Sequence, residues 1–229
     1  MSWIKASAVT IALVIQTACT TNVLPVPSDE VLPGFFPVSS TNLLNVGSAV
    51  QWNEEYAVSA AHIPQLPNVE YHCSTGCDLV FIRRKAEGAV PDWRAAVTGE
   101  RVKTAGINSL MLTVKGVGTN NGQRVRLDSK SDRGIYVLSD APVADGMSGG
   151  PVYGSDNAVV GMTVGIFVPY TLSPNDTRQH KKTMTTYVPY EAIRHEWKLF
   201  SQGKLATRVG GASGVPKVSE RLKVSARAL

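Results

Sequence analysis

The chain has 229 residues, a formal net charge of +5 and a charged fraction of 18%. This length allows one or two closely packed domains with a substantial core, and the frequent glycine, proline, valine and threonine favour a β-rich globular protein. Much of the basic excess lies in residues 202–229, without a nucleic-acid recognition motif or a basic and aromatic stripe. We therefore expect a flexible basic tail there and no nucleic-acid partner.

The first 18 residues have the pattern of a signal peptide, with Lys5, an apolar run over residues 6–15 and small residues before Cys19. The run is too short to span a bilayer comfortably as a mature helix. Residues 15–19, Ile-Gln-Thr-Ala-Cys, resemble the lipobox of bacterial lipoproteins, although glutamine stands where leucine is usual. The resemblance implies cleavage before Cys19 and lipidation of that cysteine, with plain secretion or an uncleaved anchor as alternatives. In each case we expect an exported protein of the cell envelope or periplasm, membrane-anchored if Cys19 is lipidated.

Residues 19–37 are rich in Pro, Ser, Thr and Asn and show no hydrophobic period, so we expect a tether. From residue 38 onward, short β-rich runs alternate with turn signals, which favours an antiparallel barrel or sandwich. We place one domain at residues 38–201, with an internal boundary near residues 90–100. The expected strands are residues 46–52, 56–62, 93–97, 101–107, 110–117, 123–127, 134–139, 158–168 and 183–188.

A helix is expected over residues 191–200, because Ile193, Trp197 and Phe200 have a helical spacing on one face. The chain has four histidines, so each can be weighed by its surroundings. Three of them are interpreted as surface or structural residues: His72, His180 and His195.

Cys73 and Cys77 flank a short segment containing Gly76, a spacing that can close a small loop in an oxidising compartment. We favour a disulfide or two free thiols. His72 is the only other residue beside them of a type that binds metals, and a second pair of ligands at zinc spacing is lacking. We therefore predict no metal and no other cofactor. A redox or metal role centred on these three residues is the alternative.

A glycine-rich turn surrounds one serine in the stretch Asp145-Gly146-Met147-Ser148-Gly149-Gly150-Pro151. Glycine reaches positive φ without steric cost and proline holds φ near about −65°, so such a turn can lift a hydroxyl out of the chain and leave bare amides beside it. Acyl transfer needs both features: a nucleophilic oxygen, and N–H donors aimed at the developing oxyanion. Taken alone, the motif is equally compatible with a plain hairpin turn.

Two further segments carry residues that such a serine would need. Residues 58–62, Val-Ser-Ala-Ala-His, end at His62, and 16 residues later Asp78 precedes the apolar run Leu-Val-Phe-Ile. A carboxylate beside a buried strand is costly unless it is paired, and a histidine Nδ1–H is a suitable partner. Together with the glycine-rich turn, these segments resemble the His, Asp and Ser motifs of chymotrypsin-like (trypsin-like) serine peptidases, in the family order. The resemblance covers roughly residues 40–195.

The resemblance implies an all-β fold of two antiparallel six-stranded-type barrels with a C-terminal helix. It also implies a serine endopeptidase acting on protein or peptide substrates, with Ser148 as nucleophile, His62 as general base and Asp78 as the group that orients the imidazole. The backbone N–H groups of Gly146 and Ser148 would form the oxyanion hole. Asp92 or another carboxylate is the alternative third member, because the 16-residue interval is shorter than in most members and implies a trimmed first barrel.

Met147 stands where the trypsin branch has an aspartate that receives a newly cut N-terminal amine, so we expect the zymogen switch to be absent. Residues 141–144 carry no charge, which favours an apolar or small substrate residue before the scissile bond. Two alternative functions are a catalytically inactive surface or binding protein on the same fold, and an esterase using the same triad, because a fold does not fix a function. No oligomeric state is predicted.

Overall fold

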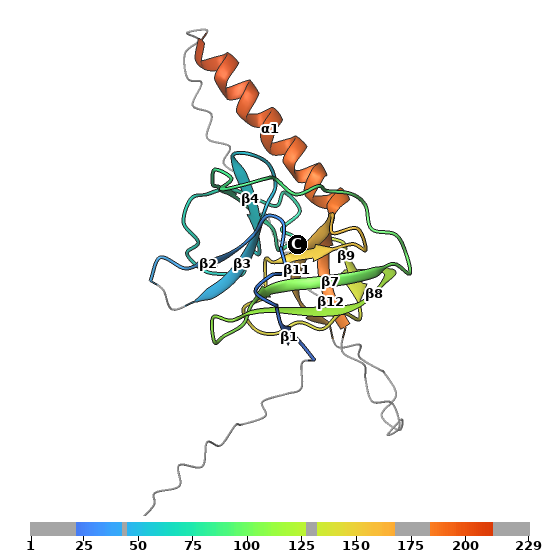
Figure 1. Cartoon of the computed structure of the whole chain (residues 1–229). Helices are drawn as coiled ribbons and strands as arrows, with labels where there is room; N and C mark the ends of the chain where they lie inside the picture. Colours follow the sequence, from blue (N-terminus) through green and yellow to red (C-terminus); the bar gives the residue numbers. More distant parts are fainter. Residues whose placement is uncertain (1–21, 43–44, 127–131, 168–183, 213–229) are drawn as a thin grey trace, which may run out of the picture.

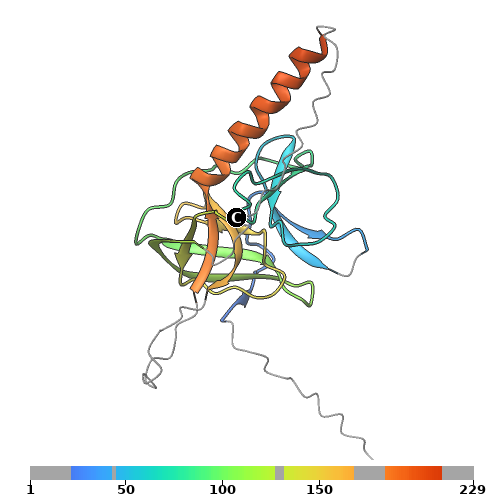
Figure 2. The same cartoon turned by 180° about the vertical axis from the view of Figure 1, so that it is seen from behind.

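A computed structural model describes residues 22–42, 45–126, 132–167 and 184–212, which form two antiparallel sheets and one long helix. The strands of the first sheet are β2 (Phe35–Ser39), β3 (Val46–Gln51), β4 (Tyr56–Ser59), β5 (Val69–His72) and β6 (Val80–Arg83). The strands of the second are β1 (Leu24–Pro25), β7 (Arg101–Ile107), β8 (Thr113–Val125), β9 (Tyr136–Ser139), β10 (Pro151–Tyr153), β11 (Val159–Phe167) and β12 (Met184–Pro189). Figures 1 and 2 show the two sheets side by side from opposite directions.

The second sheet closes on itself. Its strand order is β1-β8-β7-β10-β11-β12-β9, and β9 also pairs with β8, so the six strands β7 to β12 form a barrel with β1 added outside β8. The first sheet has the order β2-β3-β4-β6-β5 and five strands among the described residues. The predicted all-β, two-barrel fold with a C-terminal helix is confirmed, and the five strands of the first sheet agree with the trimmed first barrel that the sequence led us to expect.

The main hydrophobic core lies between the two sheets. It is a single cluster that combines Val58 and Phe81 of the first sheet with Tyr136, Tyr153 and Met162 of the second. A smaller cluster fills the second barrel; its members are Val102, Val137, Ala141, Val152, Val160 and Tyr187. Because the shared core spans the junction, loops from both sheets are held in fixed positions where the two sheets meet.

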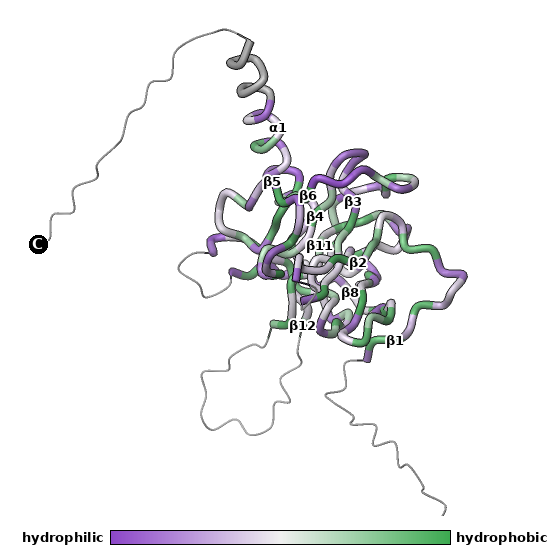
Figure 3. Tube along the Cα trace, turned by 90° about the vertical axis from the view of Figure 1, so that its left-hand side faces the viewer, coloured by the Kyte–Doolittle hydropathy of each residue, from purple (hydrophilic) through white to green (hydrophobic). Residues whose placement is uncertain are grey.

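Helix α1 (Tyr190–Ala212) follows β12 directly and packs an aromatic face against the first sheet. Ile193 and Phe200 are buried and Trp197 is half-buried, which confirms the predicted apolar face. The rings that Trp197 and Phe200 contact belong to Tyr56, Tyr71 and Phe81. Figure 3 shows hydrophobic and hydrophilic stretches alternating along the first turns of α1, as expected for a helix with one apolar face. Within the described residues, no helix has the length and apolar character needed to cross a membrane.

The helix is longer than predicted, and this corrects the assignment of residues 202–229 as a flexible tail. Residues 202–212 continue α1. At the start of this stretch the ammonium of Lys204 contacts the Glu70 carboxylate and the Tyr56 hydroxyl. This ion pair to the first sheet favours continuation of the helix beyond residue 201. So does the helix that precedes it, because adding residues to an existing helix is easier than starting a new one. Residues 213–229 lie outside the described part of the chain.

The described part of the expected tether, residues 22–37, belongs to the folded domain. β1 pairs with β8 through Leu24 and Lys115, and β2 pairs along its whole length with β3. Both strands lie at the edge of a sheet. Proline is tolerated at an edge because its missing N–H faces outward, so the prolines that suggested a linker are compatible with pairing here. Residues 1–21, with the predicted signal peptide and Cys19, lie outside the described part.

Three of the expected strands also need correction. Residues 110–117 and 123–127 were expected to be separate strands around a turn, but β8 runs continuously across that turn, with a register irregularity between Asn120 and Arg124. A bulge accommodates the Gly-Thr-Asn-Asn-Gly sequence without ending the strand. The expected strand at residues 93–97 is reduced to an isolated bridge from Trp93 to Val159.

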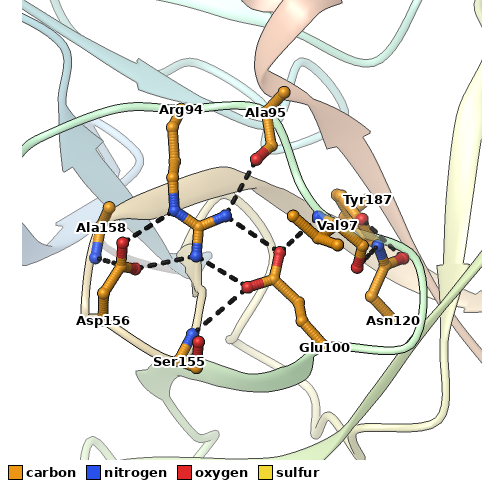
Figure 4. A network of polar contacts seen from close by, with 9 residues as sticks. All are labelled: Arg94, Ala95, Val97, Glu100, Asn120, Ser155, Asp156, Ala158 and Tyr187. Atoms are coloured by element: carbon orange, nitrogen blue, oxygen red, sulfur yellow. Dashed lines mark hydrogen bonds and ion pairs between the residues drawn. The ribbon is translucent and has the colours of Figure 1, made fainter.

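The segment that leads from the first sheet to the second is held by a charged network (Figure 4). The Arg94 guanidinium donates to Glu100 at 2.7 Å and to Asp156 at 2.8 Å. The hydrogen bonds from Arg94 are the main cause of a lowered pKa at both carboxyls, which falls to about 2 for Asp156. Because Asp156 lies in the β10–β11 turn, the network fastens the connecting segment to the second barrel.

Candidate active site

His62 lies just beyond the end of β4. Its Nδ1 lies 2.5 Å from Oδ2 of Asp78, and its backbone N–H donates to Oδ1 of the same carboxylate at 2.8 Å. A carboxylate only accepts, so Nδ1 carries the proton and Nε2 keeps its lone pair. The hydrogen bond to Asp78 raises the pKa of His62 above 6.5, against the opposing effect of partial burial. The His62 side chain is 49% exposed.

The partner of His62 is therefore Asp78 and not the alternative Asp92, which is exposed. Asp78 is held in place by two residues whose role could not be predicted from the sequence, Tyr136 and Asp132. Its backbone N–H donates to the Tyr136 hydroxyl at 2.8 Å, and that hydroxyl donates to Oδ2 of Asp132 at 2.5 Å. Tyr136 is fully buried, and burial is the main cause of its raised pKa. This chain of hydrogen bonds ties Asp78, in the loop between β5 and β6, to β9 of the second sheet.

The segment before Asp78 is held by a disulfide between Cys73 and Cys77, with a Cα–Cα distance of 5.4 Å. Its loop is fixed by Glu196 of α1, which is 2% exposed. The Ser74 N–H and hydroxyl donate to this carboxylate at 2.8 and 2.9 Å, and the Tyr71 hydroxyl donates at 2.8 Å. Buried carboxylates require such partners. Both cysteines are thus joined in a disulfide and carry no free thiol. Among the described residues, no group of three or more His, Cys, Asp or Glu side chains is placed to hold a metal ion.

Ser148 lies on a turn that only glycine can build. Gly146 and Gly149 have φ values of +94° and +85°. A Cβ added to Gly149 would lie 2.1 Å from the carbonyl oxygen of Ser48 and 2.4 Å from Oγ of Ser59. The turn therefore fits directly against β3 and β4. Since β4 leads to His62, this fit brings the half-buried Ser148 to the same junction between the sheets.

Ser48 of β3 holds this turn and is a second contributor that sequence reasoning missed. Its N–H donates to the Ser148 carbonyl at 2.8 Å, and its hydroxyl donates to the Gly146 carbonyl at 2.9 Å. The same hydroxyl accepts the N–H of Ile107 at 3.0 Å. Ser48 is fully buried, so these three bonds are shielded from water. A small residue within a predicted strand gave no signal of this role.

The backbone amides of Gly146 and Ser148 flank Met147 in this turn. Among the described residues, neither the N–H of Gly146 nor that of Ser148 donates a hydrogen bond, whereas Met147 N–H donates to the Ala144 carbonyl at 3.1 Å. The Met147 side chain is fully buried in an apolar cluster. Its partners there are Val23, Val114, Val143 and Ala144. Apolar packing thus occupies the position where the trypsin branch has an aspartate.

The Ser148 hydroxyl donates to the carbonyl of Val164 in β11 at 3.1 Å, and no hydrogen bond joins it to His62 within the described residues. The structure thus places the predicted His62 and Asp78 in direct contact and Ser148 at the same junction. A proton transfer from Ser148 to His62 would need a hydrogen bond to Nε2 in place of the one to Val164. Catalytic hydrogen bonds are often long or misaligned before substrate binds.

The other two described histidines play no part in this arrangement. His72 is exposed at the end of β5 and His195 is exposed on α1. His180 lies outside the described residues.

Comparisons with known proteins give structural matches only. No protein-family model matches the chain, and no curated protein matches it. The Rv3671c protease from M. tuberculosis, in its active form, is 15% identical with a TM-score of 0.55, over 72% of this chain and 79% of that chain. A serine endoprotease from Yersinia pestis is 16% identical with a TM-score of 0.56, over 75% and 64%. The MamO protease domain from Magnetospirillum magneticum is 17% identical with a TM-score of 0.54, over 72% and 96%.

At these identities the likeness establishes the fold. The chain has the two-barrel, chymotrypsin-like fold of serine proteases.

Proposed function

We propose that this protein is a serine endopeptidase. The observation that carries the proposal is the pair of hydrogen bonds that His62 donates to the Asp78 carboxylate, at the junction where the glycine turn presents Ser148. The structural neighbours support the proposal, because the three cited above are described as proteases. The Gly146 and Ser148 amides, which lack an acceptor within the described residues, supply donors for an oxyanion.

In the proposed reaction, the Ser148 hydroxyl turns to Nε2 of His62, which takes its proton as Oγ attacks the carbonyl carbon of a peptide bond. The Asp78 carboxylate holds the ring in the tautomer that leaves Nε2 free, and it stabilises the imidazolium that forms. The oxyanion is received by the amides of Gly146 and Ser148. His62 then gives its proton to the leaving amine, and water releases the acyl group by the same steps in reverse order.

The experiment is labelling of purified residues 20–229 with a fluorophosphonate probe, which reacts with an activated serine. Wild type should be labelled, and Ser148→Ala and His62→Ala should not. A matched control is His195→Ala, which removes an exposed histidine from α1 and should leave labelling unchanged. Cleavage of a casein substrate, measured on the same four proteins, then separates a peptidase from an esterase.

One observation favours a second candidate, a catalytically inactive binding protein on the same fold. The Ser148 hydroxyl is engaged by Val164 and not by His62. If a correctly folded wild type is not labelled, as judged by cooperative thermal unfolding, this second candidate replaces the first.

We further propose that the protein is exported and anchored to a membrane through a lipidated Cys19. The support is the signal-like pattern of residues 1–18 and the lipobox-like residues 15–19. The Cys73–Cys77 disulfide is consistent with an oxidising compartment. Metabolic labelling with a fatty-acid analogue should mark the wild type and not Cys19→Ser. Labelling of neither protein would favour plain secretion.

A further inference from the structure

We propose that the tip of the β7–β8 hairpin binds an apolar side chain of the substrate close to the scissile bond. The tip consists of Leu110, Met111 and Leu112, and we call it the apolar tip. The inference rests on the proposed peptidase function and adds a substrate preference to it.

The apolar tip is exposed to an extent that apolar residues rarely reach in succession. Leu110 is 74% exposed, Met111 57% and Leu112 54%. Hairpin turns usually carry Gly, Asn, Asp, Ser or Pro. A run of consecutive exposed apolar residues costs solubility without contributing to the core, and it is expected at a binding surface.

The apolar tip is held in a defined shape. The Asn108 side-chain oxygen accepts the N–H groups of Leu110 and Leu112 at 3.0 and 2.9 Å, and the Asn108 N–H donates to the Leu112 carbonyl at 2.9 Å. Met111 has a φ of +61°, a left-handed conformation that glycine or asparagine adopts with less strain. Strained residues concentrate at functional sites, where the side chain has a use that offsets the strain.

The root of this hairpin is in contact with the proposed oxyanion turn. A Cβ on Gly146 would lie 2.9 Å from the Ile107 carbonyl oxygen and 3.1 Å from the carbonyl carbon of Asn108. The hydroxyl of Ser48 also joins the two segments, because it accepts the Ile107 N–H and donates to the Gly146 carbonyl. The β7–β8 hairpin therefore begins beside the Gly146 amide, which would bind the oxyanion.

The position of the hairpin beside Gly146 determines which kind of group the apolar tip would bind. Gly146 lies against the hairpin root, where Asn108 is across from Leu112, so a peptide whose carbonyl oxygen reaches the Gly146 amide would lie beside that root. An extended peptide advances about 3.3 Å per residue, so side chains about two to four residues from the scissile bond come within reach of the apolar tip. An aliphatic or aromatic side chain there would be removed from water by the tip, and a polar one would not gain from the contact.

The test compares internally quenched peptides that differ only in leucine or serine, at successive positions on both sides of the scissile bond. We expect wild type to cleave the leucine peptide about tenfold better by kcat/KM at a position on one side. In the triple variant Leu110→Ser, Met111→Asn and Leu112→Ser, this ratio should fall close to one. Asparagine tolerates the left-handed conformation, so the hairpin keeps its shape.

The control is Val97→Ser, because Val97 is an apolar residue of similar exposure, 61%, near the start of β7, at the end opposite the hairpin. It should retain the wild-type ratio. Fluorophosphonate labelling of wild type reports the proposed function separately, since the probe carries no peptide side chains.

A labelled wild type without a leucine preference, or with one that the triple variant retains, would overturn the inference and leave the proposed function standing. Loss of vesicle binding or of self-association in the triple variant, with an unchanged ratio, would assign the apolar tip to a membrane or to a second copy and overturn it too. An unlabelled wild type would remove both proposals.

Discussion

The two sides of the candidate site are held in place by different physical means. On one side, Asp78 and His62 are fixed by side-chain hydrogen bonds that reach Tyr136 and Asp132; we call this the base side. On the other, Ser148 is fixed by the positive φ values of Gly146 and Gly149 and by backbone packing against β3; we call this the nucleophile side. Side-chain hydrogen bonds weaken gradually when the pH changes or when one atom of a partner is removed. A backbone turn that has no room for a Cβ is lost as a whole when a Cβ is added. The two sides should therefore differ in how they respond to substitution.

The largest effect is expected from Gly149→Ala on the nucleophile side. The new methyl would lie 2.1 Å from a backbone oxygen, at a φ of +85°. Strain and overpacking together should lower the free energy of unfolding by about 2 to 4 kcal/mol, measured by urea denaturation, and abolish fluorophosphonate labelling. The control is Gly203→Ala in α1, where a Cβ meets nothing within 4 Å. It should raise stability by up to about 1 kcal/mol.

On the base side, Tyr136→Phe should act in a graded manner. Loss of the hydroxyl leaves the Asp78 N–H and the Asp132 carboxylate without this partner. We expect kcat to fall about tenfold with little change in KM, and stability to fall by about 1 to 3 kcal/mol. Tyr187→Phe is the matched control, because this fully buried tyrosine donates instead to Asn120 at 3.0 Å. Equal loss of kcat in both variants would show that Tyr136 acts through stability alone.

A pH titration should distinguish the base side further. The hydrogen bond that His62 donates to Asp78 raises the pKa of His62, and only the neutral ring can accept the serine proton. Activity should therefore be lost as pH falls through a midpoint above 6.5, while the stabilisation from this pair is present below 6.5 and lost as pH rises through the folded pKa. NMR of the His62 ring in Ser148→Ala checks the midpoint without requiring activity. The midpoint should move to lower pH when Asp78→Asn is added.

The smallest effect is expected away from both sides, at Asp156. Its carboxylate pairs with Arg94 but is 55% exposed, so Asp156→Asn should lower stability at neutral pH by less than about 1 kcal/mol. The hydrogen bond from Arg94 lowers the pKa of Asp156 to about 2, so the difference from wild type is present above pH 3.8 and disappears as pH falls through about 2. Thermal unfolding at several pH values measures it. Glu87→Gln, which alters an ion pair at an 80% exposed glutamate, gives the baseline for a surface change.

The nucleophile side was predictable because its constraints are local. Positive φ and a close backbone approach both demand glycine, so the sequence around Ser148 carries the signature of the turn itself. His62 and Asp78 were predicted from the resemblance of residues 58–62 and 78–82 to the His and Asp motifs of chymotrypsin-like serine peptidases.

The supports of the site were not predictable, because they join distant parts of the chain. Tyr136 meets Asp78 across 58 positions and Glu196 meets Ser74 across 122. Nothing near Tyr136 or Glu196 in sequence records those partners. The N-terminal boundary was wrong for a similar reason: the pairing of β1 and β2 is decided by the strands they meet, and their own prolines suggested a linker.

The closure of the second barrel by β8 and β9 has a consequence for self-association. A closed barrel offers no free strand edge, and the strand added outside it, β1, is two residues long and ends in Pro25. The first sheet does have two free edges among the described residues, but β2 carries Pro37 and β5 is four residues long. Short or proline-bearing edges are poor templates for further strands. The architecture therefore resists strand-by-strand polymerisation even at the high local concentrations that a crowded compartment or a surface can impose.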